Sequence, residues 1–272
     1  MTTQRPSILV GCDGSPESAT ALAWAADHAR RTNGSLHLVS CWEWPTLQGA
    51  PITYGQWQPE SECTSRLARL RTSVDLPDNR VTTDVVRGHP AHVLVRRAAD
   101  VDLVVVGTHG LGAVSRLILG SVSAYCAGHS PVPVAVVRES PGRRGVLVGV
   151  DGSESAGVAL RWAMDYADSA LEPLTVMQTI EPSVGGDRET RRQLRELVEK
   201  AHADRGSAVM SGVRIRVLEG NPAHVLVEQS KYASVTVVGR RGAGGFLRLV
   251  VGSVAAALAH HGQSTVVITP GP

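Results

Sequence analysis

The sequence has few of the residues that several common kinds of active site require. Only two of its 272 residues are lysines, Lys200 and Lys231, and neither lies in a glycine-rich loop. The Walker phosphate-binding loop, Gly-x4-Gly-Lys-Ser/Thr, is therefore absent. A serine nucleophile elbow with its acid and histidine is absent as well, so a serine hydrolase has no support.

Long apolar runs and an excess of charge are also missing. No apolar run approaches the roughly 20 residues that cross a bilayer, and residues 1–6 contain no apolar signal-peptide core. The formal net charge is only +2, with no basic face evident in the sequence, so nucleic-acid binding has little electrostatic support. We therefore expect a cytoplasmic protein that binds neither a membrane nor nucleic acid.

Cysteine and histidine do not occur at the spacings of a metal site. The four cysteines all fall in the first half and form no Cys-x-x-Cys pair: Cys12, Cys41, Cys63 and Cys126. We interpret them as unpaired thiols in a reducing compartment. The close histidine pairs, such as His89 with His92, lack carboxylate or cysteine neighbours, so we expect no protein-held zinc.

What the sequence does contain is one glycine pattern written twice. Each copy follows an apolar run and has the spacing Gly-x2-Gly-x9-Gly-Ser. The first copy is Gly107, Gly110, Gly120 and Ser121, and the second, 132 residues later (239 − 107), is Gly239, Gly242, Gly252 and Ser253. An Asp-Gly-Ser sequence also recurs, at Asp13 and Asp151.

This pattern is typical of an anion site. Glycine allows a positive φ and a close approach of backbone, and the loop leads to a helix N-terminus, where unpaired N–H groups favour a phosphate. Ser121 and Ser253 are placed either to cap that helix or to bind a ligand oxygen. For a single copy, a glycine-rich turn without a ligand is an equal alternative, but two copies in register favour the anion site.

Predicted strands and helices alternate in each half. The predicted strands are 7–12, 36–42, 80–87, 103–106 and 131–137, then 145–150, 174–180, 213–218, 235–239 and 265–269. The predicted helices are 15–30, 59–73, 90–99 and 121–129, then 155–167, 187–208, 222–232 and 252–260. Such alternation implies parallel strands joined by right-handed crossovers. We predict two tandem doubly wound α/β domains, residues 1–140 and 145–272, each a five-stranded parallel sheet with helices on both faces.

In such a sheet a ligand binds beyond the carboxyl ends of the strands, where the strand order reverses. If the first and fourth strands are neighbours there, Asp13 and Gly107 project into one crevice. From the residues alone, two roles of Asp13 and Asp151 are equal: to accept hydrogen bonds from ribose hydroxyls, or to cap the following turn.

An aromatic segment distinguishes the first half from the second. Residues 43–59 hold Trp44, Tyr54 and Trp57 among prolines and glycines, whereas the counterpart at 181–186 is shorter and has no aromatic residue. We prefer a loop that folds over its own domain, and a lid or a partner surface is the alternative.

Together these residues resemble the ATP-binding signature of the universal stress protein family. The matching features are the two glycine loops after buried strands and the aspartate that ends the first strand of each half. The resemblance covers nearly the whole chain and is to tandem, two-domain members. It implies that ATP, with Mg²⁺, binds in each half.

The resemblance also implies a role for particular residues. Asp13 and Asp151 match the acidic residue near the sugar and the metal–phosphate region, and backbone at Cys41 and Thr179 matches the adenine contact. The phosphate contacts match the glycine loops and their neighbours: Gly107, His109, Gly110, Gly120, Ser121 and Val122, then Gly239, Arg241, Gly242, Gly252, Ser253 and Val254.

Between the loop glycines the two halves differ, because His109 stands where Arg241 stands. A guanidinium is always charged and binds phosphate oxygens in a fork, whereas neutral imidazole offers one donor. We therefore expect the second site to hold phosphate more strongly, unless the aromatic segment compensates in the first.

The resemblance implies a regulator of the stress response or of dormancy that changes shape or partner with nucleotide. The protein partner is unknown, and the apolar last strands are expected to pair with each other, with a homodimer in addition. No obvious residue activates a water, which favours slow or absent hydrolysis. Two alternatives stay open: a weak ATPase or phosphotransferase that uses Asp13 or Asp151 with Mg²⁺, and a nucleotide-free interaction scaffold.

Overall fold

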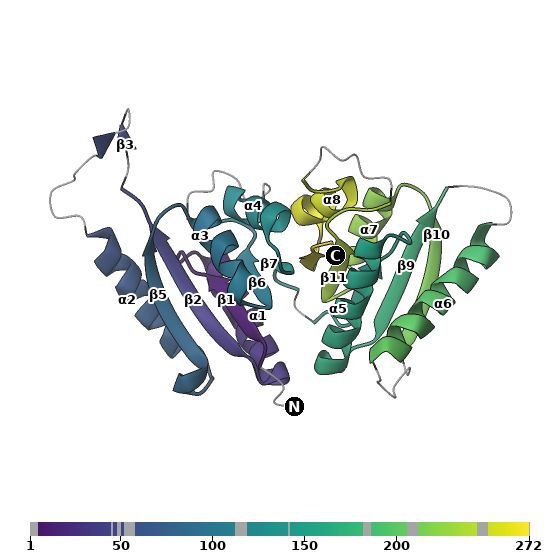
Figure 1. The fold of residues 1–272 in the computed structure, drawn as a ribbon, viewed down its shortest axis with the longest axis horizontal. Helices are drawn as coiled ribbons and strands as arrows, with labels where there is room; N and C mark the ends of the chain where they lie inside the picture. Colours follow the sequence, from purple (N-terminus) through teal and green to yellow (C-terminus); the bar gives the residue numbers. More distant parts are fainter. Residues whose placement is uncertain are drawn as a thin grey trace. The chain divides into compact units, whose positions relative to one another are not determined.

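The computed structural model describes residues 5–44, 46–47, 50–51, 58–111, 119–140, 142–181, 186–205, 212–243 and 250–271. Residues 112–118 and 244–249, which belong to the predicted glycine segments, lie outside the described ranges. By its contacts the chain divides into two compact units (Figure 1). Unit 1 is Met1–Cys126 with Ser130–Val132, and unit 2 is Ala127–His129 with Pro133–Pro272.

Unit 1 is built on four parallel strands. They are β1 (Ser7–Gly11), β2 (Ser35–Trp42), β5 (Val81–Arg87) and β6 (Leu103–Gly107), in the order β5-β2-β1-β6. The helices are α1 (Pro16–Thr32), α2 (Pro59–Thr72), α3 (Pro90–Arg97) and α4 (Ser121–His129), with 3₁₀ turns at Asp78–Arg80 and Ala98–Asp100; the last three residues of α4 are grouped with unit 2. The chain crosses the sheet through α3 in the opposite direction from α1 and α2, so right-handed crossovers place α3 on the other face.

Unit 2 repeats this arrangement with five parallel strands. They are β8 (Val146–Gly149), β9 (Leu174–Ile180), β10 (Val213–Glu219), β11 (Val235–Gly239) and β12 (Thr265–Thr269), in the order β10-β9-β8-β11-β12. The helices are α5 (Glu154–Ala170), α6 (Gly186–Arg205), α7 (Pro222–Ser230) and α8 (Ser253–His261). The predicted doubly wound α/β fold is confirmed.

The strand β7 (Val134–Val137) is the last strand of the first sequence repeat, yet its contacts place it in unit 2. It pairs antiparallel with β12, with Val136 opposite Val266 and Val134 opposite Ile268. The pairing expected between the two apolar terminal strands is therefore confirmed. The contacts therefore group β7 with unit 2 although it belongs to the first sequence repeat, and the predicted domain bounds, 1–140 and 145–272, stay a prediction.

Helices α1 and α5 begin and end at corresponding signals. The Ser15 and Ser153 hydroxyls accept hydrogen bonds from the backbone N–H groups of Ser18 and Ala156, both at 3.1 Å, which is the contact of an N-cap. Both helices end on a residue in the left-handed conformation: Asn33 (φ 55°) after α1 and Leu171 (φ 53°) after α5.

Predicted boundaries differ from the observed ones by a few residues at several helix ends. The helices predicted at 90–99 and 222–232 end earlier, at Arg97 and Ser230. The helix predicted at 187–208 is described as far as Arg205, and residues 206–211 lie outside the described part.

The aromatic segment contains two very short strands that the sequence does not predict. β3 (Thr46–Leu47) and β4 (Ala50–Pro51) pair antiparallel. Trp42 and Trp44 meet edge to face at 5.7 Å, and the Arg87 guanidinium lies 5.7 Å from the centre of a Trp42 ring. Tyr54 and Trp57 lie outside the described residues, so the choice between a covering loop and a lid stays a prediction.

All four cysteines are free thiols, as predicted. Burial raises the pKa of the Cys12 and Cys126 thiols to about 12 and that of Cys41 to about 11, which makes them poor nucleophiles. No helix in the described ranges combines the length and the apolar character that a membrane span needs.

The C-terminus of α5 gives a stability prediction. Leu171 has a positive φ and is 84% exposed. Side-chain packing therefore does not offset the energetic cost of its left-handed backbone. Leu171→Gly should raise the free energy of unfolding by about 1 kcal/mol. Asn33→Leu, the matched change after α1, should lower it by a similar amount. Urea unfolding measures both, and a loss of stability in Leu171→Gly would contradict the strain argument.

Candidate functional site

In each unit the strand order reverses beside the first strand of the repeat. β1 lies next to β6, with Ile8 opposite Leu103, and β8 lies next to β11, with Val146 opposite Val235. Because the paired strands are parallel, their carboxyl ends lie at the same edge of the sheet. Asp13 follows β1 and Gly107 ends β6. The prediction that the first and fourth strands are neighbours, with these two residues at the same edge, is therefore confirmed.

A cavity lies at each of these edges, and every predicted site residue lines one of them. The first cavity, of about 370 Å³, is lined by Asp13, Cys41, Gly107, His109, Gly110, Gly120, Ser121 and Val122, among others. The second cavity, of about 550 Å³, is lined by Asp151, Thr179, Gly239, Arg241, Gly242, Gly252, Ser253 and Val254, among others. The structure thus brings the residues together, and their roles in binding stay predictions.

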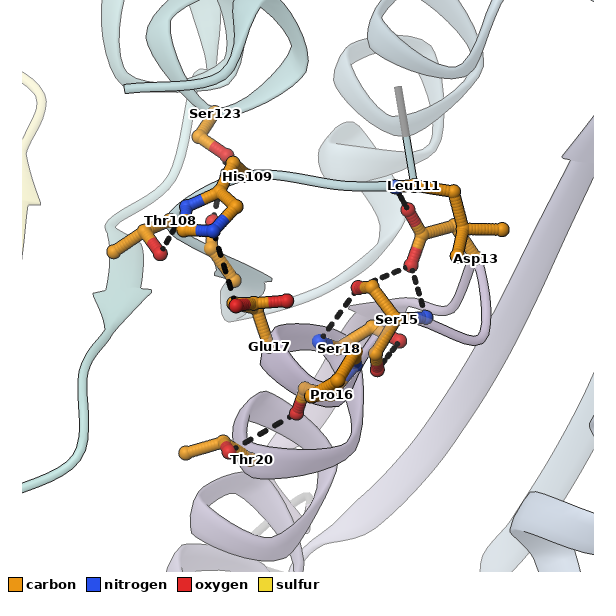
Figure 2. Close-up of polar contacts among 11 residues, drawn as sticks. Asp13, Ser15, Pro16, Glu17, Ser18, Thr20, Thr108, His109, Leu111 and Ser123 are labelled. Carbon is orange, nitrogen blue, oxygen red and sulfur yellow. Dashed lines mark hydrogen bonds and ion pairs between the residues drawn. The ribbon is translucent and has the colours of Figure 1, made fainter. Parts of the chain in front are cut away.

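Asp13 joins the end of β1 to the glycine loop (Figure 2). Its Oδ1 accepts hydrogen bonds from the Ser15 backbone N–H at 2.9 Å and from the Ser15 hydroxyl at 2.6 Å. Its Oδ2 accepts a hydrogen bond from the backbone N–H of Leu111 at 2.9 Å. The carboxylate therefore caps its own turn, and it also holds the loop that follows β6.

Asp151 makes the same contacts in unit 2. Its Oδ1 accepts from the Ser153 backbone N–H at 3.1 Å and hydroxyl at 2.6 Å, and its Oδ2 accepts from the Ala243 N–H at 2.8 Å. The turn-capping role left open by the sequence is thus observed in both units. Carboxylate oxygens can accept more than one hydrogen bond, so this role leaves the ribose contact possible.

The loop glycines are required by close approach. A Cβ on Gly110 or Gly242 would lie 2.2 Å from Oδ2 of Asp13 or Asp151. A Cβ on Gly107 would lie 2.9 Å from the backbone of Glu17 in α1. None of these three glycines is among those with a positive φ. Glycine is therefore needed there because of the close approach, and not because of a left-handed backbone.

Ser121 and Ser253 do not cap their helices. The N-cap residues of α4 and α8 are Gly120 and Gly252, and neither helix has a side-chain cap. The capping role proposed from the sequence is therefore wrong, because each serine is the first helical residue. Among the described residues, the N-cap residue of neither helix supplies a side-chain acceptor to these helix starts, which suits an anion.

The structure adds Ser123 and Glu17 to the first site. The Ser123 hydroxyl donates a 2.7 Å hydrogen bond to the Gly107 carbonyl, and Ala255 lines the second cavity at the corresponding position. Glu17 lies in the first turn of α1, and its Oε1 is 3.0 Å from Nε2 of His109. The sequence carries one signal for Glu17: the corresponding residue of the second repeat is a serine, Ser155.

His109 is held by two neighbours. Besides the approach to Glu17, its Nδ1 lies 2.9 Å from the Thr108 hydroxyl, and the side chain is only 9% exposed. The contact with Glu17 has the distance of an ion pair but not the angles of a hydrogen bond. Arg241, its counterpart, is exposed and lines the second cavity.

No group of three or more histidine, cysteine, aspartate or glutamate side chains lies close enough to hold a metal ion in the described ranges. Mg²⁺ commonly binds through one or two carboxylates together with the phosphates of its ligand. The arrangement of Asp13 and Asp151 beside the helix starts fits that mode.

Comparison with known families matches the Universal stress protein family model twice, over residues 5–138 and 142–270. The chain belongs to the universal stress protein family. Two matches in series confirm the tandem organisation. Universal stress protein Rv1996 of Mycobacterium tuberculosis is 30% identical over 306 residues, which cover 97% of this chain and 95% of the relative. Universal stress protein Rv2005c of the same organism is 29% identical, over 96% of each.

Solved structures agree with this universal stress protein in fold. A universal stress protein from Archaeoglobus fulgidus DSM 4304 matches with a TM-score of 0.74, covering 98% of this chain and 97% of its own at 18% identity. A Pseudomonas aeruginosa UCBPP-PA14 protein described as a putative universal stress protein matches with a TM-score of 0.70 at 19% identity.

Electrostatics at Asp13 of this universal stress protein give a pH prediction. Burial raises the pKa of the Asp13 carboxyl, but hydrogen bonds from Ser15, Leu111 and Ser18 outweigh burial and lower it below the ordinary 3.8. A lowered folded-state pKa gives stability that is present above the unfolded pKa and is lost as pH falls through the folded pKa. The stability advantage of wild type over Asp13→Asn should therefore be constant above about pH 5 and shrink below about pH 4.

Urea midpoints between pH 3 and 7 measure this difference. Asp75→Asn, at a side chain that is 97% exposed, is the control and should give a small difference at every pH. A difference between wild type and Asp13→Asn that does not change with pH would contradict the prediction.

Proposed function

We propose that this universal stress protein binds adenine nucleotides, foremost ATP with Mg²⁺, and acts as a nucleotide-responsive regulator of the stress response or of dormancy. The observation that carries the proposal is the repeated construction of the two cavities. In each, a strand-end aspartate accepts a hydrogen bond from the glycine loop, and a helix begins in the cavity lining. Both volumes, about 370 and 550 Å³, lie in the range of small-molecule sites, about 300–1,000 Å³.

The chain's own residues suit the parts of such a ligand. Backbone N–H groups at the starts of α4 and α8, around Ser121 and Ser253, would hold phosphate oxygens. Backbone at Cys41 and Thr179 lies in the lining near the ends of β2 and β9 and would face the base. Bound Mg²⁺ would neutralise phosphate charge beside the aspartates.

The described polar groups favour binding over hydrolysis. Both oxygens of Asp13 and of Asp151 already accept hydrogen bonds from the chain, and the two His109 nitrogens face Thr108 and Glu17. These contacts orient the groups toward the loops, which favours holding a ligand in place over taking a proton from water. We therefore propose that nucleotide binding acts through a change of shape or of partner. The chain would form a homodimer and bind a protein partner that is not identified.

Thermal unfolding with and without Mg-ATP tests the proposal. A ligand at 100 times its Kd adds about 2.7 kcal/mol, which raises Tm by roughly 5–10 °C for domains of this size. Gly110→Glu and Gly242→Glu each place a side chain on the strand-end carboxylate of one cavity. Because Arg241 is expected to make the second cavity the stronger phosphate site, Gly242→Glu should lose most of the Tm shift. Gly110→Glu should lose the smaller part.

Gly271→Glu is the matched control, because no described atom lies within 4 Å of a Cβ at Gly271. It should keep the full shift. Purified wild type that carries no nucleotide and shows no shift would contradict nucleotide binding and support the scaffold alternative. Turnover of ATP that is lost in Asp151→Asn while binding persists would support the ATPase alternative.

A further inference from the structure

Unit 2 has a third cavity, of about 180 Å³, at the other end of its strands from the second cavity. The third cavity is lined by the start of β8, from Gly145, whereas the second is lined by its end, from Gly149. Helix α7 lies along both: Pro222 at its start lines the second cavity, and Gln229 near its end lines the third. Met177 of β9 is the only lining residue that the two share. The third cavity is therefore a separate place in the fold.

Three arginines line this cavity, which we call the arginine cavity. Arg144 precedes β8, and Arg214 and Arg216 belong to β10, the outermost strand of unit 2 in the sheet order (Figure 1). Residues two apart in a strand lie on the same face, and all three arginines are exposed. None of the lining residues is an aspartate or a glutamate. The lining therefore carries three positive charges and no negative one.

The three guanidinium groups make few contacts with the protein. Arg144 donates to the Leu171 carbonyl at 3.4 Å, and Arg216 donates to Oε1 of Gln229 at 3.0 Å. Arg214 makes no side-chain hydrogen bond or ion pair with the residues that the structure describes. A guanidinium has five N–H donors, and both acceptors are neutral. Most of the donors and all of the positive charge are therefore left uncompensated by these contacts.

Two sources of negative charge lie near the arginine cavity. Glu172 is outside the lining, and its Oε2 accepts hydrogen bonds from the Gly145 N–H, at 2.7 Å, and from the Ser234 hydroxyl. The C-terminal end of α7 carries a partial charge of about half a unit. Together they amount to about one and a half negative charges against three positive ones, so the cavity keeps a net positive charge.

The corresponding contact in the first repeat is neutral. Arg216 corresponds to Asp84 (216 − 84 = 132), and Gln229 corresponds to Arg97 (229 − 97 = 132); the strand pairing gives the same correspondence. In unit 1, Arg97 and Asp84 form an ion pair. Both units thus join the same strand to the same helix through these positions, but only unit 2 does so with a cation that no carboxylate neutralises.

The other two arginines also have uncharged counterparts. Arg214 corresponds to Thr82 (214 − 82 = 132), and Arg144 corresponds to Pro6 (144 − 6 = 138). Unit 1 forms the same order of its first four strands without these charges. The arginines are therefore particular to the second repeat and are not required by the fold.

We propose that the arginine cavity is a second kind of anion site, which binds a phosphate group, either free or as the ester of a small molecule. Guanidinium groups bind phosphate oxygens in a fork, and the multiple charge of phosphate suits three cations better than a single carboxylate does. A volume of about 180 Å³ is below the roughly 300–1,000 Å³ of drug-sized ligands, so it suits a small anion. The inference does not depend on nucleotide binding.

Calorimetric titration of the full chain tests the proposal. The probes are pyrophosphate, inorganic phosphate, glycerol phosphate and acetate, each at low salt and without Mg²⁺. The phosphate compounds should bind, and acetate should bind at least about tenfold more weakly. Binding should weaken as salt is added, because the screening length falls from about 10 Å at 0.1 M to about 3 Å at 1 M. The tighter of inorganic phosphate and glycerol phosphate identifies the free anion or the ester as the ligand.

Variants assign the binding to the arginine cavity. Arg214→Gln should weaken pyrophosphate binding about tenfold or more, the effect of one charge-assisted contact. Arg216→Asp with Gln229→Arg installs the ion pair of unit 1 at the same positions and should weaken it at least as much, with the contact between β10 and α7 retained. Arg69→Gln, at an exposed arginine of α2, makes the same change of charge elsewhere and should leave the affinity unchanged.

Three results would overturn the inference: equal weakening by Arg69→Gln and Arg214→Gln, acetate binding as tight as that of phosphate, or no pyrophosphate binding at all. Loss of the pyrophosphate event in Gly242→Glu, with Arg214→Gln unaffected, would also overturn it, because the anion would then bind in the second cavity. Absence of a Tm shift with Mg-ATP would instead contradict the proposed nucleotide function and leave the phosphate event of the arginine cavity in place.

Discussion

The hydrogen bond between a strand-end carboxylate and the glycine loop is the contact on which each cavity depends. Asp13 accepts from the Leu111 N–H, and Asp151 accepts from the Ala243 N–H. The contact is so close that any Cβ on the second loop glycine would meet the carboxylate. Partial burial of the carboxylate is unfavourable, and the hydrogen bonds that Asp13 accepts outweigh that cost. This interaction holds the first part of the loop, and the helix start that follows is held by backbone hydrogen bonds from Gly120 to Thr108 and from Gly252 to Arg240.

Because backbone and a single carboxylate form this contact, the side chains between the loop glycines are free to differ. The two repeats use that freedom in opposite ways. In the first, His109 is packed between Thr108 and Glu17, and in the second, Arg241 is exposed in the cavity. The same scaffold therefore carries different side chains between the loop glycines of its two cavities.

Several site features could be predicted from sequence because they depend on local spacing. Ser15 and Ser153 cap helices that begin with their neighbours, and the aspartates stand where the first strands end. The roles of Ser121 and Ser253 could not be predicted, because an N-cap needs a non-helical backbone, and Gly120 and Gly252 have it. Glu17 was also missed, since its mismatch with Ser155 marks a difference between the repeats but does not show that the side chain lies beside His109.

The sequence by itself determined the two repeats, the alternation of strands and helices, and the set of residues around each cavity. These follow from periodicity and from motif spacing, which act within short stretches of chain. Only the tertiary structure decided that β7 is grouped by its contacts with unit 2, that the His109 ring faces Glu17, and that the cavities differ in volume. Each of these depends on the distance between segments far apart in the chain, which packing fixes and local sequence does not encode.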